Sequence, residues 1–261
     1  LGVARGVGIR SAMWNVPEVT NAHLRDFAEL MRQLFRGERV SYDGPLGSFP
    51  YLHLADYLHE DIPLLFAGFG EKSLEAAGAV FDGVVLHTFL GEEAVGRCVA
   101  AVRRGAERAG RDPSKVKVWS VVAVACDPSE ESVLRKLVAR LATYMQAPGY
   151  GDLLVSVNRW DAAKLDAFRN DDLVCEIRGG IDGTGTLDQL REIAKLVPEE
   201  WRNAAVGDAG TCARHIAREL TLGVDGVILH ASTATELAPV IAAYADVRDG
   251  ASFAGRTNRP A

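Results

Sequence analysis

The stretches FDGVVLH, residues 81–87, and VDGVILH, residues 224–230, repeat one pattern of Asp-Gly, three aliphatic residues and a His. Each copy follows a segment of helical spacing that ends in small residues, KSLEAAGAV before the first and HIARELTLG before the second. A continuous aliphatic run is typical of a strand that is buried on both faces of a parallel sheet. The repeat therefore predicts a unit of helix, short turn and buried strand that the chain uses twice.

The rest of the chain shows the same alternation of short apolar runs and longer segments of helical period, which is typical of βα units. We expect strands at residues 1–4, 62–68, 83–87, 115–127 and 224–230, and helices at residues 21–37, 71–80, 92–109, 128–145 and 208–223. Residues 38–49 carry turn-forming residues and predict a small hairpin. Five such strands fit a (β/α)8 TIM barrel, a fold that usually takes about 250 residues. An open, doubly wound sheet is the rival fold.

We interpret residues 1–261 as a single domain, in which residues 147–200 form an insertion that caps the main body. Clusters of Gly, Pro and Asp among short helical pieces distinguish this insertion from the regular units around it. Residues 250–261 predict a loosely ordered tail. The opening LGVARGVGIR reads as the middle of a strand and its glycine turn, so we expect the early barrel strands to lie upstream of Leu1.

The composition of the chain argues against several classes of partner. The net charge is −6 at pH 7 and no basic stripe is interleaved with aromatic residues, so we expect no nucleic-acid partner. No apolar run approaches the ~20 residues that span a bilayer, and no signal peptide opens the sequence, so we expect a cytoplasmic protein that does not enter a membrane. The cysteines lack the close spacing of a metal site, which predicts buried free thiols and no metal; they are Cys98, Cys126, Cys175 and Cys212.

The stretch PLLFAGFGEKS, residues 63–73, is the sharpest local signal for a ligand. A buried strand runs into a glycine turn, and a helix starts at about Glu71. Glycine lets the backbone approach a ligand closely, and a helix N-terminus offers unpaired N–H groups and the positive end of its dipole to a phosphate. Lys72 and Ser73 would add a charge and a hydroxyl group. The alternative is a tight turn without a ligand, because neither GxxxxGK[ST] nor GxGxxG is present.

Four tracts, in this order and spacing, resemble the bacterial luciferase-like monooxygenase superfamily: LGVARG, FAELMRQLFRGERVSYDG, IPLLFAGFGEKSLEAAGAVFDGVVL and VGDAGTCARHIARELTLGVDGVIL. Within it, the chain is most similar to the branch of actinobacterial oxidoreductases that use the deazaflavin coenzyme F420, in which LRxLFRGExVxYxG is characteristic. The resemblance covers most of the chain apart from the insertion and the tail. It implies a (β/α)8 barrel with an insertion, in which LGVARG is the fourth strand and DGVILH the eighth.

The resemblance also implies where the cofactor binds, namely at the carboxyl ends of the strands. The turn at residues 67–73 matches the family loop that receives the phosphate-bearing tail, and Arg5 with Gly6 matches a second cofactor-facing loop. Family members place further residues that contact the cofactor ring on the early strands. The candidate cofactor-binding residues here are Arg5, Gly6, Ala67, Gly68, Phe69, Gly70, Lys72 and Ser73.

His87 and His230 would lie at the carboxyl ends of two barrel strands, which is the functional face of such a barrel. An imidazole there could donate to a carbonyl group or shuttle a proton beside the hydride acceptor, and we take His87 as the candidate catalytic residue. The alternative is a His that bonds a loop carbonyl and closes the rim. Asp82 and Asp225 would lie at the opposite rim, with a structural role.

The resemblance implies hydride transfer between F420 and a small organic substrate, with the protein holding the ring against the substrate carbon and excluding water. One alternative is an FMN-dependent monooxygenase on the same fold that receives reduced flavin from a separate reductase. Another is a non-catalytic barrel remnant that binds a flavin, a fatty ligand or a partner subunit. Family members are commonly dimers, so we expect a homodimer. Four residues in loops are candidates for the substrate pocket: Trp14, His53, Tyr57 and His59.

Overall fold

The computed structural model describes residues 1–6, 15, 17–56 and 61–251. Three residues expected in the substrate pocket, Trp14, Tyr57 and His59, lie outside these ranges, as do residues 252–261 of the expected tail. Within the described ranges, every helix is too short or too polar to cross a membrane.

Six strands form one parallel sheet, as the alternation of apolar runs and helical segments predicts. Their order is β1-β4-β5-β6-β7, and β8 also pairs with β6. Among the residues described, β1 pairs only with β4, so the ring of strands is not closed there. The parallel pairing confirms the α/β class. The strands are β1 (Gly2–Ala4), β4 (Leu65–Ala67), β5 (Gly83–Val85), β6 (Lys117–Cys126), β7 (Ala205–Gly207) and β8 (Gly226–His230).

Strand β7 is the one strand of the sheet that the sequence analysis missed. It has 3 residues and pairs in parallel with residues 124–126 of β6. Strands β4 and β5 are equally short but lie within the longer apolar runs IPLLFAG and GVVL, whereas β7 has only the run AAV at residues 204–206, so the apolar pattern does not reveal it. Residues 119–123 of β6 pair directly with β8, so β7 does not lie between these two strands. Counted back from β8 as the eighth barrel strand through β6, β5 and β4, β1 is the fourth strand, in agreement with the resemblance.

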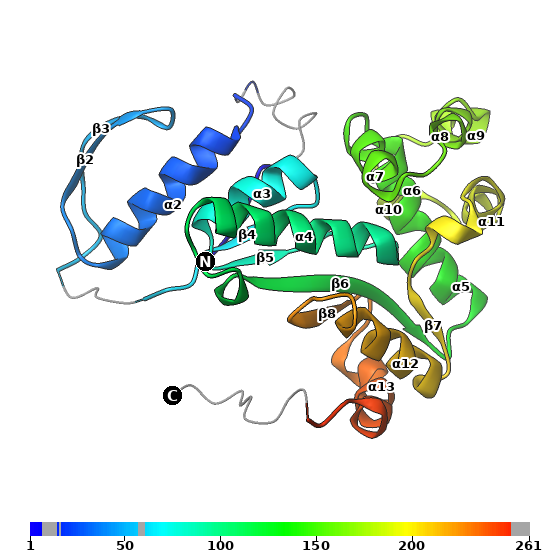
Figure 1. Ribbon diagram of the computed structural model, residues 1–261. Coiled ribbons are helices and arrows are strands. Elements are labelled where there is room, and N and C mark those ends of the chain that lie inside the picture. Colours follow the sequence, from blue (N-terminus) through cyan, green and yellow to red (C-terminus); the bar gives the residue numbers. More distant parts are fainter. Residues whose placement is uncertain (7–14, 16, 57–60, 252–261) are drawn as a thin grey trace.

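The helices cover the sheet on two sides. Figure 1 shows α3 and α4 along one side and α12 and α13 along the other, while α6 to α11 gather near the carboxyl end of β6. The helix expected at residues 128–145 is a succession of α5, a π-helical turn at Leu134–Val138 and α6. The helices are α2 (Asn21–Phe35), α3 (Glu71–Val80), α4 (Glu92–Arg108), α5 (Glu130–Val133), α6 (Ala139–Gln146), α7 (Tyr150–Asn158), α8 (Ala162–Arg169), α9 (Asp172–Glu176), α10 (Ile181–Thr184), α11 (Leu187–Leu196), α12 (Ala209–Leu220) and α13 (Ala234–Val247).

The expected hairpin is formed by β2 (Val40–Gly44) and β3 (Gly47–Leu52), which pair antiparallel. It lies beside α2 at the end of the molecule opposite α6 to α11 (Figure 1). The segment expected as an insertion, residues 147–200, contains α7 to α11. Its role as a cap stays a prediction.

Helices α3 and α4 cross in close backbone contact. A Cβ atom at Gly78 would lie 2.1 Å from the carbonyl oxygen of Val102, and one at Gly105 would lie 1.8 Å from the carbonyl oxygen of Glu75. Only glycine permits this approach, because no side chain fits between the two backbones. The crossing fixes the axis of α3, and with it the position of the helix N-terminus beside the glycine turn.

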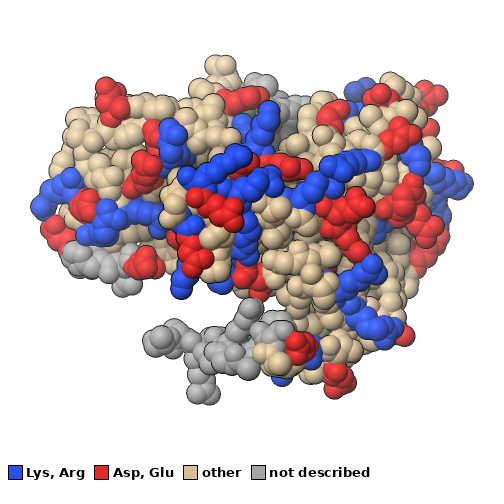
Figure 2. Space-filling model, in the orientation of Figure 1, with Lys and Arg blue, Asp and Glu red and all other residues tan. Residues whose placement is uncertain are grey.

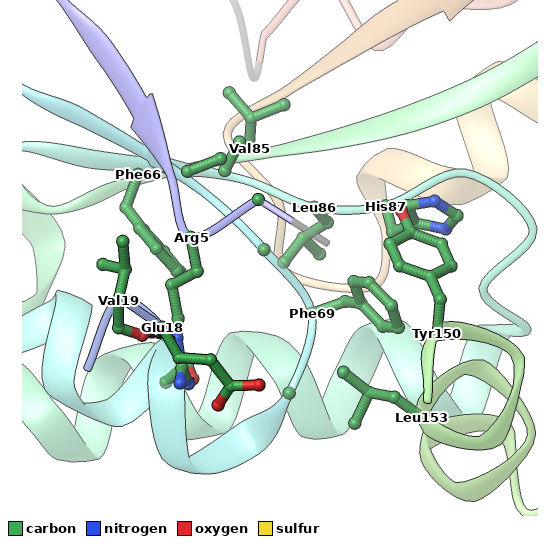
Figure 3. A pocket seen from close by; sticks show the side chains of 16 residues that line it. Arg5, Glu18, Val19, Phe66, Phe69, Val85, Leu86, His87, Tyr150 and Leu153 are labelled. Carbon is green, nitrogen blue, oxygen red and sulfur yellow. Dashed lines mark hydrogen bonds between the residues drawn. The ribbon is translucent and has the colours of Figure 1, made fainter. Parts of the chain in front are cut away.

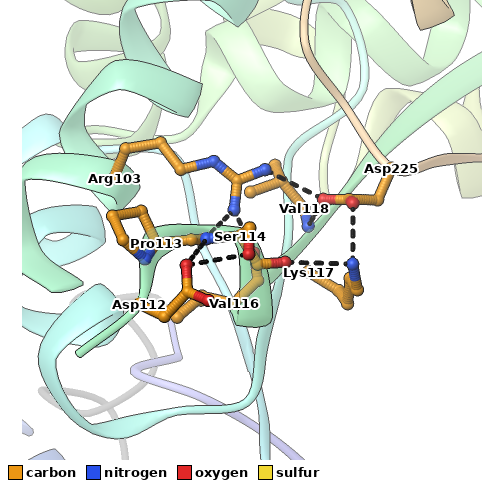
Figure 4. A network of polar contacts seen from close by, with 8 residues as sticks. All are labelled: Arg103, Asp112, Pro113, Ser114, Val116, Lys117, Val118 and Asp225. Carbon is orange, nitrogen blue, oxygen red and sulfur yellow. Dashed lines mark hydrogen bonds and ion pairs between the residues drawn. The ribbon is translucent and has the colours of Figure 1, made fainter.

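In each copy of the seven-residue repeat, the Asp accepts a hydrogen bond from the segment of the strand next to its own. Oδ2 of Asp82 accepts a hydrogen bond from the backbone N–H of Leu64 at 2.8 Å, and Oδ2 of Asp225 accepts one from Val118 at 3.0 Å. Arg103 also donates to Asp225 at 3.0 Å (Figure 4). Both carboxylates precede the amino end of a strand, on the rim opposite the two histidines. The structural role expected for Asp82 and Asp225 is therefore confirmed.

All four cysteines are free thiols, as the sequence predicts. Cys98 and Cys212 are buried, but Cys126 is half-buried and Cys175 is exposed, so the expectation of burial is wrong for Cys175. The Cys98 thiol donates to the carbonyl oxygen of Phe69 at 3.5 Å, behind the glycine turn. Burial raises the pKa of Cys98 to about 12, which leaves it a neutral packing group.

Candidate active site

A cavity of about 450 Å³ opens at the carboxyl ends of β1, β4 and β5 (Figure 3). Its wall comes from residues 4–6, 18–19, 66–70, 73, 85–87, 150 and 153, which are far apart in the sequence. A volume of this size is ordinary for a small-molecule site. Seven of the eight residues predicted to bind the cofactor line it: Arg5, Gly6, Ala67, Gly68, Phe69, Gly70 and Ser73.

The glycine turn forms one side of this cavity and is not sealed beneath side chains. Gly68 continues the sheet, because its N–H donates to the carbonyl oxygen of Val85 at 3.0 Å. Gly70 is the N-cap residue of α3 and provides no side-chain cap. The N–H of Ser73 already donates to the carbonyl oxygen of Gly70 at 2.9 Å. The N–H groups before it have no acceptor within the helix, so the start of α3 can receive an anion from the cavity.

Arg5 joins the end of β1 to this helix start. Its Nε donates to the carbonyl oxygen of Val19 at 2.7 Å, and its Nη1 donates to Oγ of Ser73 at 3.1 Å. Gly6 follows with φ of +76°, a left-handed conformation that favours glycine. The two glycine-rich loops, which the sequence predicts separately, therefore meet at one corner of the cavity with a guanidinium group between them.

Two charged residues at the start of α3 face away from the cavity. Glu71 lies 3.5 Å from Arg97 and 3.9 Å from Arg104 of α4, so its charge is compensated on the outer surface, where Figure 2 shows acidic and basic side chains interspersed. Lys72 lines a separate surface groove with residues 75, 76, 79, 105, 108 and 109. The structure thus does not bring Lys72 to the predicted cofactor site.

His87 lies at the inner end of the cavity, two residues after β5. Its Nδ1 is 2.6 Å from the carbonyl oxygen of Thr88, so Nδ1 carries the hydrogen in the neutral ring and donates it. Nε2 is buried and has no hydrogen-bond partner among the residues that the structure describes. Burial lowers the pKa of His87 to about 4, so the ring is neutral at pH 7. A neutral ring in this tautomer accepts at Nε2, and the expected donation to a substrate carbonyl is not available to it.

Aromatic rings surround His87 on several sides. Its ring centroid lies 4.6 Å from that of Phe69, 4.7 Å from that of Tyr144 and 5.3 Å from that of Tyr150. Burial raises the pKa values of both tyrosines, so their hydroxyl groups stay protonated. Figure 3 shows Tyr150 and Leu153 entering from α7, on the side opposite Arg5.

Tyr150, Leu153, Glu18 and Val19 line the cavity but were missed by the sequence analysis. No motif marks them. The only available signal was that Tyr150 opens a helix directly after Pro148 and Gly149, in the segment expected to cap the barrel.

The other candidate residues lie away from the cavity wall. His230 ends β8; its Nδ1 is buried without a hydrogen-bond partner, and burial together with the charge of Arg140 lowers its pKa. His53 follows β3, and its Nε2 lies 3.2 Å from Asp56. Within the described ranges, no three His, Cys, Asp or Glu side chains are grouped as metal ligands would be.

Comparison with known proteins shows which family has this sequence pattern. A family model described as luciferase-like monooxygenase matches residues 2–226. The chain belongs to the luciferase-like monooxygenase family. The match covers β1 through the start of β8, and thus every strand that borders the cavity.

Curated proteins are similar in sequence to this chain over most of its length. The F420-dependent glucose-6-phosphate dehydrogenase of Mycobacterium leprae is 31% identical over 211 residues, which are 80% of this chain and 54% of that protein. The 5,10-methylenetetrahydromethanopterin reductase of Methanolobus tindarius is 28% identical over 218 residues, which are 82% of this chain and 61% of that protein. The chain thus spans little more than half the length of these luciferase-like relatives.

A solved structure supports the fold. The coenzyme F420-dependent tetrahydromethanopterin reductase of Methanopyrus kandleri superposes with a TM-score of 0.71 at 19% sequence identity, over 93% of this chain and 71% of that chain. The family match and this likeness establish the luciferase-like (β/α)8 barrel, to which the described strands contribute a part, and reject the open doubly wound sheet.

Proposed function

We propose that this luciferase-like protein is an F420-dependent oxidoreductase that transfers a hydride between the deazaflavin and a small organic substrate. The observation that carries the proposal is the meeting of Arg5, Gly6 and the turn at residues 67–73 on one cavity. The proteins from M. leprae and M. kandleri, which are both named as F420-dependent, support this choice of cofactor.

The corner around Arg5 fits the phosphate-bearing tail of the cofactor. It offers a guanidinium group, the hydroxyl group of Ser73 and the uncapped start of α3, which are three kinds of phosphate ligand. Glu18 is the one acidic residue of the described wall and lies beside Arg5 in Figure 3. Because a carboxylate repels a phosphate, we place the tail on the side of Arg5 that faces α3. Lys72 is left out of the site.

The remaining wall suits the reacting end of the cavity. When bound, the deazaflavin supplies the hydride acceptor or donor. Phe69, Leu86 and Tyr150 exclude water there, which strengthens the polar contacts that remain. His87 is the candidate catalytic residue, placed to contact the substrate through Nε2.

Titration of the protein with F420 and, separately, with FMN tests the proposal, with quenching of cofactor fluorescence as the signal. We expect micromolar binding of F420 and much weaker binding of FMN. The reverse order would favour the FMN-dependent monooxygenase. Failure to bind either cofactor would favour the non-catalytic barrel remnant.

The proposal includes a homodimer in the cytoplasm. The homodimer is implied by the family resemblance, and the four free cysteines agree with a reducing compartment. Light scattering on the purified protein measures the oligomeric state, and cell fractionation measures the location. A monomer, or recovery outside the cytoplasm, would remove that part of the proposal.

A further inference from the structure

The buried Nε2 atom of His87 is a hydrogen-bond acceptor to which no group of the described ranges donates. The contact between Nδ1 and the carbonyl oxygen of Thr88 fixes the tautomer, so Nε2 carries the lone pair. Buried polar atoms in folded proteins almost always have a partner, and an exception at a cavity wall points to a ligand that supplies one. Here the missing partner must be an O–H or N–H group.

The surroundings of His87 determine what kind of molecule can bring that donor. The rings of Phe69, Tyr144 and Tyr150 lie within 4.6–5.3 Å of its ring centroid, and Leu86 and Leu153 complete the wall. A charged group placed among these side chains would lose its hydration without a partner of opposite charge. Burial also keeps His87 neutral, so it does not attract an anion.

The charged and the apolar parts of the cavity are separated. Figure 3 shows Arg5 at one end and His87 with Tyr150 at the other. At its end, Arg5 donates to Oγ of Ser73 in the first turn of α3. If the Arg5 corner holds the cofactor tail, the substrate meets the end that has one neutral acceptor and an apolar wall. A phosphorylated sugar, the substrate in the name of the M. leprae relative, does not match that end.

We infer that the substrate is an uncharged alcohol with an apolar or aromatic body, whose hydroxyl group donates to Nε2 of His87. This inference rests on the proposed function, which assigns the Arg5 corner to the cofactor. A ketone of the same skeleton has no donor and would set its oxygen lone pairs against the lone pair of Nε2. The site therefore binds the alcohol in preference to the ketone, and His87 confers this specificity as a hydrogen-bond acceptor.

A matched pair of probes tests this directly. The dissociation constants of 1-phenylethanol and acetophenone are measured by calorimetry, with and without saturating F420. We expect the alcohol to bind at least tenfold more tightly than the ketone, since an unpaired buried acceptor carries a penalty of that order. H87F should remove the preference while keeping an aromatic ring in the cluster. H230F, at the matching position of the second heptad and off the cavity wall, should retain it.

A second measurement reports directly on Nε2 of His87. In a protein labelled with ¹⁵N at histidine, the Nε2 resonance of His87, assigned with H87F, should move when 1-phenylethanol is added and stay in place with acetophenone. Equal affinities for the two probes, tighter binding of glucose 6-phosphate, or an unmoved resonance would overturn the inference. A protein that binds F420 but does not distinguish the probes refutes this inference alone. One that distinguishes them without binding F420 refutes the proposed function and leaves the hydroxyl site standing.

Discussion

The guanidinium group of Arg5 donates to Oγ of Ser73 at 3.1 Å, although 68 positions separate the two residues in the chain. The same side chain donates to the carbonyl oxygen of Val19 at 2.7 Å, so it is held from two directions. This arrangement unites the loop after β1 with the first turn of α3. It places a fixed cation where an uncapped helix already favours an anion.

Replacing Arg5 with Ala should weaken F420 binding by roughly 10- to 100-fold, because a charge-assisted hydrogen bond contributes about 1.5–3 kcal/mol. Fluorescence titration at constant ionic strength measures the change. K72A is the matched control, since Lys72 carries the same charge two residues after Gly70 but lines another groove. We expect K72A to bind F420 within about twofold of the unchanged protein, because screening weakens distant surface charges. Equal weakening by both variants would contradict a specific contact at Arg5.

The neutral state of His87 should make stability depend on pH. Its pKa is about 4 in the folded chain and 6.5 in the reference state, so between these values the unfolded chain binds a proton that the folded chain does not. Stability therefore falls as the pH drops from 6.5 to 4, by on the order of 3 kcal/mol for this one group.

Urea unfolding of the unchanged protein and of H87F at pH 7 and pH 4.5 measures this contribution. Burial also lowers the pKa values of His215 and His230, and both remain in the variant. The charge of His230 contributes to the low pKa of His87, so the difference measures His87 together with this coupling. We expect the unchanged protein to lose more stability than H87F over this interval. Parallel losses would show that His87 is not buried as a neutral ring.

Asp225 should be far more important for stability than a surface acid with a similar ion-pair distance. D225A leaves the N–H of Val118 and the guanidinium of Arg103 without this acceptor in a half-buried network (Figure 4), which should cost roughly 2–4 kcal/mol. D56A breaks the exposed pair of Asp56 with Arg39 at 2.8 Å and should cost about 0–0.5 kcal/mol. Urea unfolding at pH 7 compares the two, and similar losses would refute the structural role of Asp225.

Two glycines of α4 should respond in opposite directions to the same substitution. G105A forces a methyl group against the carbonyl oxygen of Glu75 and should destabilise the protein by about 3 kcal/mol or more. G96A meets no atom within 4 Å and should stabilise it by about 0.5–1 kcal/mol, because alanine is the better helix former. Thermal unfolding measures both, and a neutral G105A would show that α3 and α4 do not cross as closely as described.

The fold could be predicted largely from local patterns. Apolar runs located five of the six strands in the sheet, and helical periodicity located α2, α3, α4 and α12, because those patterns depend on residues that are near neighbours in the chain. Strand β7 was missed because only the short run AAV, residues 204–206, marks it in the sequence. Of the candidate site, the glycine turn was visible as a motif, but the place of Arg5 beside it came only from the family resemblance. Leu153 carried no signal, and Tyr150 carried only its place at a helix start after Pro148 and Gly149, because their role depends on where α7 lies.

By itself, the sequence predicted that FDGVVLH and VDGVILH are strands, each preceded by a helix and by an Asp that bonds a neighbouring strand. The predicted burial holds for the first copy but not for the second, because β8 pairs only with β6 among the described residues and its Ile228 is 40% exposed. The tertiary structure alone decided that the first His borders the cavity and the second does not. The physical reason is that periodicity is a property of residues that are neighbours in the chain. Burial, pKa and the hydrogen-bond partners of a polar atom depend instead on side chains that distant segments bring into contact. The rings of Phe69, Tyr144 and Tyr150 give His87 an apolar environment that keeps its imidazole neutral. These three residues lie outside the seven-residue repeat.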